Sequence, residues 1–337
     1  MASVSFLLTN NCNLRCKYCY QKENKSDNIY NKTSENVIDA FAEYCKKEEI
    51  YDVKLFGGEP LFYKNLFIYC VLKLKQIVPN IHIHLVTNGT LVDMEILNII
   101  KENDISIILS LDGDRETHNL MRGGFDDILK WIPYFSNKSQ ISVALQAGQV
   151  KRLYDNIKYV WDLDFASGVY VNIIYNYGWY NETDIIMFEK EYEKAINGML
   201  NGEGVLTCAL SIFNFIEKNN INTNTCGIFT VGLASDWEGN LYPCQSAFLL
   251  GNKLCIGSIY SGIDSHKHKQ IRHDIFNSIN LSASSNKYKV ASFCPISIYQ
   301  KHNSFHGPWC DEFCQMIDIK AKLVAKYYYE IKKFCGK

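Results

Sequence analysis

The chain lacks the sequence features of a membrane-inserted or exported protein. No apolar run approaches the roughly 20 residues that a membrane-spanning helix needs. The N-terminal apolar stretch has no basic segment before it and no cleavage-site pattern, so no signal peptide is expected. A net charge of −1 gives no electrostatic reason to expect nucleic-acid or anionic-membrane binding. We therefore expect a cytoplasmic protein without nucleic-acid or membrane partners.

Cysteine, by contrast, is abundant, with 13 residues in a chain of 337. That length is enough for one large domain or two ordinary ones, and 47% hydrophobic with 21% charged residues is ordinary for a globular protein. An odd number of cysteines in a large chain without an export signal favours metal or redox chemistry over disulfides. Two of them, Cys45 and Cys70, fall on expected helices and are interpreted as buried free thiols.

Three cysteines lie close together near the N-terminus. Cys12, Cys16 and Cys19 have the spacing C-x3-C-x2-C, and Tyr18 directly precedes the last of them. A closed structural metal site normally takes four protein ligands, whereas three thiolates leave one position open for a substrate or cofactor. Half of a zinc ribbon and one arm of a ferredoxin-type site are the alternatives. Zinc sites usually pair one C-x2-C with a second, and no second pair follows here.

Strand-like and helix-like runs alternate over the first two hundred residues. A short apolar run is followed by a longer run with helical periodicity, six times in succession. This order predicts parallel α/β architecture, with too few units to close a barrel of eight. The expected strands are 4–8, 53–56, 81–86, 105–109, 141–145 and 169–174, and the expected helices are 34–47, 66–77, 93–102, 125–134, 154–162 and 184–200.

Polar and glycine-containing segments follow these strands, at the end where α/β barrels carry their chemistry. After the second strand comes Gly57-Gly58-Glu59-Pro60, in which the glycines allow a close backbone approach and Glu59 can accept from an ammonium group. Any one such segment is more often an ordinary turn. Their succession behind the cysteine motif indicates one cofactor site. Further candidates are Asn88 after the third strand, Ser110 and Asp112 after the fourth, Arg122 in the segment 118–122, and Gln146 ending the fifth.

The cysteine motif and these strand-end segments together resemble the radical S-adenosylmethionine (SAM) superfamily over roughly residues 3–200. The resemblance implies a partial (β/α)6 TIM barrel, open on one side, over residues 1–204. It implies a [4Fe–4S] cluster on Cys12, Cys16 and Cys19, with SAM chelating the fourth iron. The implied cofactor contacts are Tyr18 near the adenine, Gly57, Gly58 and Glu59 at the methionyl amino group, Asn88 near the cofactor, Ser110 and Asp112 near the ribose or methionyl end, Arg122 against a carboxylate, and Gln146.

The alternation of strands and helices stops near residue 205, where cysteines resume. Cys226 and Cys244 form C-x12-G-x4-C with Gly239 between them, which predicts a hairpin, and Cys310 and Cys314 form C-x3-C. This cysteine-rich part, 205–337, resembles the SPASM extension, which binds auxiliary iron–sulfur clusters in many peptide- and protein-modifying radical SAM enzymes. We expect it to end in an amphipathic helix over 317–334.

The match to the SPASM pattern is partial, because Ser297 stands where a second central cysteine belongs and the spacing to the next cysteine is stretched. The resemblance nevertheless implies two auxiliary [4Fe–4S] clusters. One such cluster, a structural zinc site or buried thiols are the alternatives. The implied ligands are Cys226, Cys244 and Cys314, with Cys208 as candidate fourth ligand, for the first cluster, and Cys294, Cys310 and Cys335, with the fourth ligand open, for the second.

Both resemblances imply an enzyme, a radical SAM/SPASM maturase that abstracts hydrogen with a 5′-deoxyadenosyl radical. The implied product is a ribosomally made peptide with an oxidative thioether or carbon–carbon crosslink. The implied partners are the peptide substrate, an external electron donor of the flavodoxin or ferredoxin type, and a separate leader-peptide-binding protein. That last partner is expected because the chain begins at the first predicted strand. No catalytic residue is assigned beyond the SAM cluster.

Three other functions compete with this one. A peptide epimerase needs a thiol to return hydrogen, and Cys255 is a candidate. An anaerobic sulfatase-maturase-like enzyme would make formylglycine, but its acidic base follows the cysteine corresponding to Cys244, where this chain has Gln245. A non-enzymatic iron–sulfur scaffold would need neither the SAM-facing glycines nor the acid.

Overall fold

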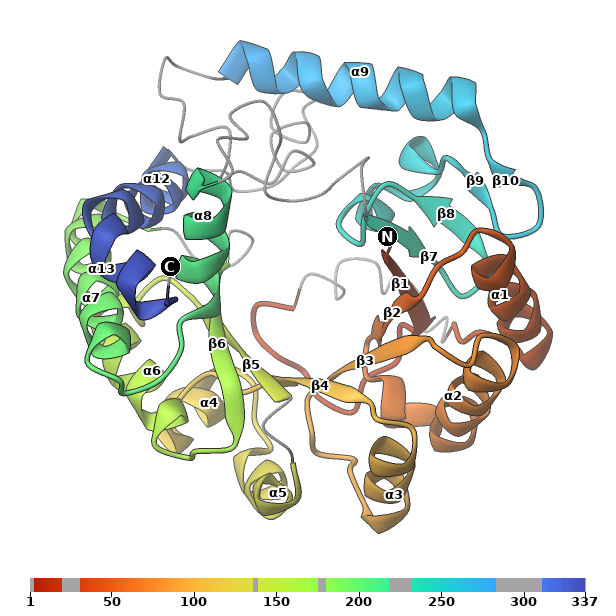
Figure 1. Ribbon diagram of the computed structural model, residues 1–337, viewed down its shortest axis with the longest axis horizontal. Coiled ribbons are helices and arrows are strands. Elements are labelled where there is room, and N and C mark those ends of the chain that lie inside the picture. The colour runs from red at the N-terminus through yellow and green to blue at the C-terminus, as the bar shows by residue number, and fades with distance from the viewer. Residues whose placement is uncertain are drawn as a thin grey trace.

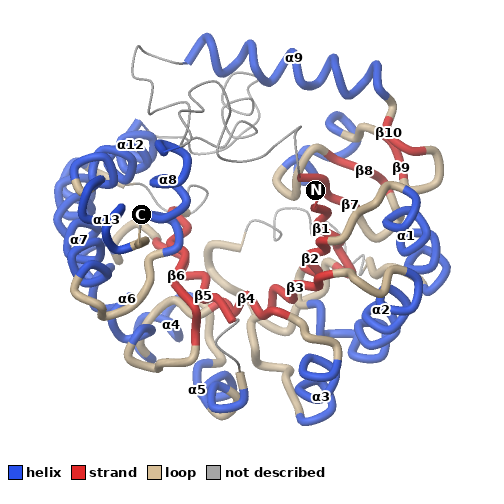
Figure 2. Tube along the Cα trace, in the orientation of Figure 1, coloured by secondary structure: helices blue, strands red, loops and turns tan. Residues whose placement is uncertain are grey.

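The computed structural model describes residues 3–19, 31–135, 139–174, 180–217, 232–282 and 311–336. One sheet curves around the centre of the molecule, and helices line the outside of the curve (Figures 1 and 2). Its first six strands run parallel in chain order, so the expected six-stranded open barrel is confirmed. They are β1 Ser3–Thr9, β2 Asp52–Gly57, β3 His82–Thr87, β4 Ser106–Ser110, β5 Ser139–Leu145 and β6 Ala166–Ile173.

Helices follow the strands because the sequence supplies starts for them. Ser34, Asp93 and Asp114 each accept a hydrogen bond from a backbone N–H of the turn that they begin, and Asn181 forms a reciprocal capping box with Asp184. The helices of this part are α1 Glu35–Lys47, α2 Lys64–Ile77, α3 Met94–Glu102, α4 Arg115–Met121, α5 Phe125–Leu129, α6 Leu153–Trp161 and α7 Glu182–Leu200, with short 3-10 turns η3 Pro60–Tyr63, η4 Ile132–Tyr134 and η5 Val150–Arg152.

Two expectations about helices are corrected. The run 125–134 is not one helix, because it divides into α5 and η4. Pro133 lacks the N–H that would bond the carbonyl of Leu129, and its ring would meet that carbonyl, so a continuous helix cannot pass this point. The segment 118–122 lies outside every expected helix, but most of it belongs to α4.

The barrel strands have one apolar and one polar face. Residues such as Phe6 and Leu55 are fully buried beneath the helices, and Phe6 stacks on Phe41 of α1 with ring centroids 4.1 Å apart. The intervening residues, such as Ser5 and Lys54, are half-buried and face the centre of the barrel. Parallel strands are usually apolar on both faces. The core therefore lies between the sheet and the helices, and the inner face is left polar.

The C-terminal third adds strands to the free edge of β1. Its first strand, β7 Gly232–Ser235, pairs parallel with β1, and the predicted hairpin is present, with Gly239 at a φ of 89° in the turn to β8 Asn240–Tyr242. The boundary between domains at 204/205 stays a prediction. The single helix expected over 317–334 is corrected, because two helices, α12 Asp311–Lys326 and α13 Tyr328–Phe334, stand in its place. The remaining elements are α8 Thr207–Glu217, η6 Ala247–Leu254, β9 Gly257–Ser258, β10 Gly262–Ile263 and α9 Ser265–Ser282.

The full strand order in the sheet is β10-β9-β8-β7-β1-β2-β3-β4-β5-β6. Helices α7, α8 and α12 pack together beside β6, and β7 and β8 lie on the other side of the barrel's central space (Figure 1). In the part of the chain that the structure describes, no helix is both long enough and apolar enough to cross a membrane.

Candidate functional site

The cysteine-containing loop, residues 10–19, leaves the C-terminal end of β1 and rests on the end of β2. Gly58 donates its N–H to the carbonyl of Thr9 at 2.8 Å, and Glu59 donates to the carbonyl of Asn11 at 2.7 Å. A Cβ on Gly57 would lie 2.2 Å from the Thr9 oxygen, and one on Gly58 would lie 2.1 Å from the Asn11 oxygen. The two glycines thus allow the backbone of β2 to approach that of the cysteine loop, in addition to any approach to a ligand.

Glu59 connects the end of β2 with the end of β3. Its side chain is fully buried, and one oxygen accepts from the Thr87 hydroxyl at 2.7 Å and the Leu61 N–H at 3.1 Å. The other oxygen accepts from the Asn88 N–H at 2.7 Å, which leaves it capacity for one more donor. Burial raises the pKa of Glu59 to about 7, although these hydrogen bonds oppose the shift. The carboxylate therefore fixes the loop that carries Asn88.

Asn88 in turn faces the cysteine loop. Its Nδ2 donates to Asn13 Oδ1 at 3.0 Å and to Cys12 Sγ at 3.8 Å, and the Leu14 N–H donates to the same sulfur at 3.4 Å. Burial raises the pKa of the Cys12 thiol to about 11 and also raises that of Cys16. Free thiolates are disfavoured here, so a bound cation is needed to keep them deprotonated.

The donor set fits an iron–sulfur cluster. N–H donors to sulfur are among the contacts by which proteins tune such clusters. Within the described segments, no three Cys, His, Asp or Glu side chains converge as ligands of one metal ion do. A [4Fe–4S] cluster spreads its thiolates over separate iron atoms. Cys12, Cys16 and Cys19 would hold it, and the open position would take SAM.

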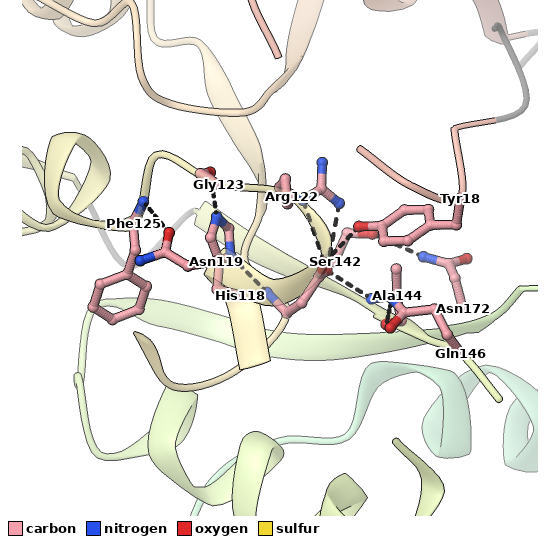
Figure 3. A network of polar contacts seen from close by, with 11 residues as sticks. Tyr18, His118, Asn119, Arg122, Gly123, Phe125, Ser142, Ala144, Gln146 and Asn172 are labelled. Atoms are coloured by element: carbon pink, nitrogen blue, oxygen red, sulfur yellow. Dashed lines mark hydrogen bonds and ion pairs between the residues drawn. The ribbon is translucent and has the colours of Figure 1, made fainter. Parts of the chain in front are cut away.

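A buried charge network lies beside this loop (Figure 3). Asp112, at the end of β4, accepts from the Tyr18 hydroxyl and from the Ala144 N–H at 3.0 Å. Arg122 donates to both oxygens of the same carboxylate, from Nε at 3.3 Å and Nη2 at 3.4 Å. The Arg122 guanidinium also lies 5.4 Å from the centre of the Tyr18 ring. Tyr18, which follows β1, is thus brought together with Asp112 and Arg122, which follow β4, and all three were expected near SAM.

His118 of α4 holds the backbone of this network. The Asp112 N–H donates to its Nδ1 at 3.2 Å, so Nδ1 is unprotonated and Nε2 donates to the carbonyl of Gly123 at 3.1 Å. Burial is the main cause that lowers the pKa of His118 to about 4, so the ring is neutral at physiological pH. His118 begins the segment 118–122, in which the sequence assigned a role to Arg122 alone. Its position one turn before Arg122 on a helix is the signal that links the two.

This neutral histidine predicts a pH dependence of stability. In the unfolded chain the ring binds a proton below about pH 6.5, whereas in the folded protein it stays neutral down to about pH 4. The stability that it supplies is complete above the unfolded value and is lost as the pH falls toward the folded one. We expect the free energy of unfolding to fall by about 2 kcal/mol more in the wild type than in His118→Asn between about pH 7.5 and about pH 5.

Urea unfolding of the two proteins across that range measures the difference. The asparagine side chain of the variant keeps an acceptor for the Asp112 N–H but cannot titrate, so the comparison isolates the ring's protonation. Equal pH profiles for the two proteins would contradict a neutral buried His118.

Two buried acceptors near the site have no hydrogen-bond donor among the described residues. They are Gln146 Oε1, after β5, and Asn11 Oδ1, in the cysteine loop. The amide nitrogens do have partners: Gln146 Nε2 donates to the Ala144 carbonyl, and Asn11 Nδ2 donates to the Tyr63 hydroxyl. An unpaired buried acceptor costs about 1–3 kcal/mol. The ammonium, hydroxyl and amine groups of SAM are donors of the kind that these oxygens lack.

Ser110, the remaining candidate, is half-buried at the last position of β4. It pairs in register with Ser142 of β5, whose hydroxyl accepts from Asn172 Nδ2 of β6 at 2.8 Å. Polar side chains therefore continue across β4, β5 and β6 on the face that looks into the barrel.

The C-terminal cysteines are only partly described. Cys208 is buried on α8 with its sulfur 3.2 Å from the Tyr192 hydroxyl, whereas Cys244 follows β8 across the central space. Cys335 is half-buried at the end of α13. The auxiliary ligand sets stay predictions. Cys45 and Cys70 are fully buried in the core, as expected. Outside the described residues lie Cys226, Cys294, Ser297 and Cys310, together with the side chain of Cys314.

The barrel and the strand-end site define a class of enzyme, and sequence comparison agrees with it. Residues 6–145 match the radical SAM superfamily. The chain is 24% identical over 297 residues to the cysteine-type anaerobic sulfatase-maturating enzyme of Clostridium perfringens, covering 77% of this chain and 78% of that one. It is 23% identical to the antilisterial bacteriocin subtilosin biosynthesis protein AlbA of Bacillus subtilis, covering 82% of this chain and 59% of that protein.

Solved structures show the same fold. The native enzyme anSMEcpe with bound AdoMet matches 98% of this chain and 99% of its own with a TM-score of 0.79 at 18% identity. Its complex with AdoMet and the Cp18Cys peptide matches 99% of both chains with a TM-score of 0.78. The protein is therefore a radical SAM enzyme, with the superfamily match in its barrel, and it is similar over most of its length to a sulfatase-maturating enzyme and to a bacteriocin biosynthesis protein.

Proposed function

We propose that this enzyme modifies a peptide, and that the modification is an oxidative thioether or carbon–carbon crosslink. The observation that carries the proposal is one connected polar network at the strand ends. Asp112 pairs with Arg122 and accepts from Tyr18 of the cysteine loop and from Ala144. The Ala144 carbonyl accepts from Gln146, whose Oε1 has no donor among the described residues. A peptide substrate is supported by the relatives, whose names include a sulfatase-maturating enzyme and a bacteriocin biosynthesis protein. A structural relative holds a peptide beside AdoMet.

In this proposal Cys12, Cys16 and Cys19 would hold a [4Fe–4S] cluster that binds SAM, and the two cofactors, with one electron from an external donor, would supply abstraction of a hydrogen atom from the substrate. The protein's residues position the cofactors and the substrate and exclude water from the reacting atoms. Asp112 and Arg122 keep Tyr18 against the SAM space, and Glu59 and Asn88 keep the cysteine loop in place. Crosslinking removes two hydrogens from the peptide. One would leave as an atom to the group derived from SAM, and the other would leave as a proton to water and an electron to an external one-electron carrier of the flavodoxin or ferredoxin type.

Formylglycine formation is the second candidate, because sulfatase-maturating enzymes cover most of the chain. It needs an acidic base, and the position expected for that base is Gln245, which is exposed. The nearest acid of the β7–β8 hairpin does not replace it. Asp236 is buried and accepts four hydrogen bonds, from the N–H groups of Glu238 and Asn240, from Asn240 Nδ2 and from the Tyr242 hydroxyl. Crosslinking needs no such base and is favoured.

Mass spectrometry separates these outcomes. A small peptide encoded beside the gene is co-expressed anaerobically with the enzyme in deuterated water, and the product is fragmented and treated with an aminooxy probe. We expect the loss of two hydrogens, no deuterium on carbon, no probe adduct and no fragmentation between the joined residues. An aminooxy adduct would establish formylglycine instead, and one retained deuterium at an α-carbon without net loss would establish epimerisation.

A further inference from the structure

The polar inner face of the barrel lines an open cavity that the site described above does not use. Its volume is about 310 Å³, and it is lined by strand residues from β1 to β5 at their N-terminal halves, opposite the cysteine loop. Register places Ser5, Lys54, His84 and Ser106 in one continuous row across four strands. A hydroxyl, an ammonium, an imidazole and a second hydroxyl therefore lie side by side on this face.

Lys54 is the unusual member of this row. No hydrogen bond or ion pair joins its ammonium to any described residue, although the side chain is half-buried. Burial lowers its pKa, and Asp52 acts in the opposite direction without reaching ion-pair distance. The Asp52 carboxylate instead contacts His84, with Oδ2 and Nε2 3.1 Å apart. The cavity thus contains a cation without a counter-ion beside an acid that already has a partner.

We propose that this cavity binds a carboxylate of the peptide substrate, either an acidic side chain or the C-terminus, through Lys54. This inference rests on the proposed function and adds a recognition site to it. Its volume is at the lower end of the range for ligand pockets, so it takes one residue and not a whole peptide. Ser5 and His84 flank Lys54 in the row, and Ser106 lies beyond His84. The Ser5 hydroxyl is a further donor for a carboxylate.

Saturation-transfer NMR on the cluster-loaded enzyme with SAM tests the proposal with small probes. The probes are N-acetylglutamate amide, N-acetylglutamine amide, and N-acetylalanine with a free carboxylate. We expect at least one carboxylate probe to bind about tenfold more tightly than the glutamine probe. The tighter of the two carboxylates identifies the side chain or the C-terminus as the source. We expect the preference to be lost in Lys54→Met, retained in Lys54→Arg, and unchanged in Lys101→Met, an exposed lysine of α3.

No preference for carboxylate in the wild type would overturn the proposal, and that measurement needs no variant. A preference that persists in Lys54→Met, with circular dichroism showing the variant folded, would overturn the role of Lys54. The proposed function fails separately, when the co-expressed peptide is unmodified or carries another modification. A modified peptide without charge preference would leave the function standing and remove only this site.

Discussion

Replacing Cys12, Cys16 and Cys19 together with alanine is expected to remove about four iron atoms per chain and to abolish formation of 5′-deoxyadenosine from SAM and reductant. The physical reason is the environment of the thiols. Cys12 and Cys16 are pushed toward the protonated form by burial, so only a bound cluster keeps them as thiolates. With the ligands gone, the open coordination position for SAM is gone as well. The measurement is iron and sulfide per chain, together with chromatography of the SAM products.

Cys70→Ala is the matched control, since it removes another thiol from the same half of the chain. Cys70 is fully buried between α2 and the sheet, and burial raises its pKa, so it has no access to a cluster. Iron content and SAM cleavage are expected to match the wild type in this variant. If the triple variant kept its iron, or Cys70→Ala lost as much, the assignment of the N-terminal cluster would be wrong. Iron above about eight atoms in the wild type would support a second auxiliary cluster.

The periodicity of the sequence predicted the barrel because the alternation of buried and inward-facing residues is set within each strand. In β1 and β2, every second residue is apolar and buried, and this alternation is legible without knowing the neighbours. The end of α5 could also have been read from Pro133. The C-terminal elements were harder to predict, because β9 and β10 have only two residues each and owe their existence to pairing with β8 and each other.

The site was predictable as a list of side chains and not as a geometry. Asp112 and Arg122 were both expected near SAM, but nothing local shows that they pair with each other across the Tyr18 ring. The Ala144 N–H was missed because a backbone donor has no signature in residue type. The two glycines were expected to meet a ligand, and the structure shows that they also meet the backbone of Thr9 and Asn11. Contacts of that kind depend on which strands become neighbours.

Arg122→Met is expected to destabilise the protein by about 3–5 kcal/mol, the usual cost of leaving a buried charge without its partner. The Asp112 side chain is fully buried and that of Arg122 is 12% exposed. Without the guanidinium, the donors that remain to Asp112 among the described residues are the Tyr18 hydroxyl and the Ala144 N–H. The measurement is the free energy of unfolding in urea at neutral pH. Arg152→Met is the control, because Arg152 pairs with Asp114 and Glu116 nearer the surface, where ion pairs contribute about 0–1 kcal/mol.

The double variant Asp112→Asn with Arg122→Met separates stability from cofactor positioning. Because it removes both charges, it is expected to be less destabilised than the sum of the single variants, with a coupling of about 0.5–3 kcal/mol. If Arg122→Met cost no more than Arg152→Met, the pair would not be the buried ion pair that the distances indicate. A folded double variant that binds its cluster but cleaves SAM poorly would show that the pair also holds Tyr18 in position. The same variant with normal SAM cleavage would reduce the pair to a structural role, and the orientation of Tyr18 would then depend on the cysteine loop alone.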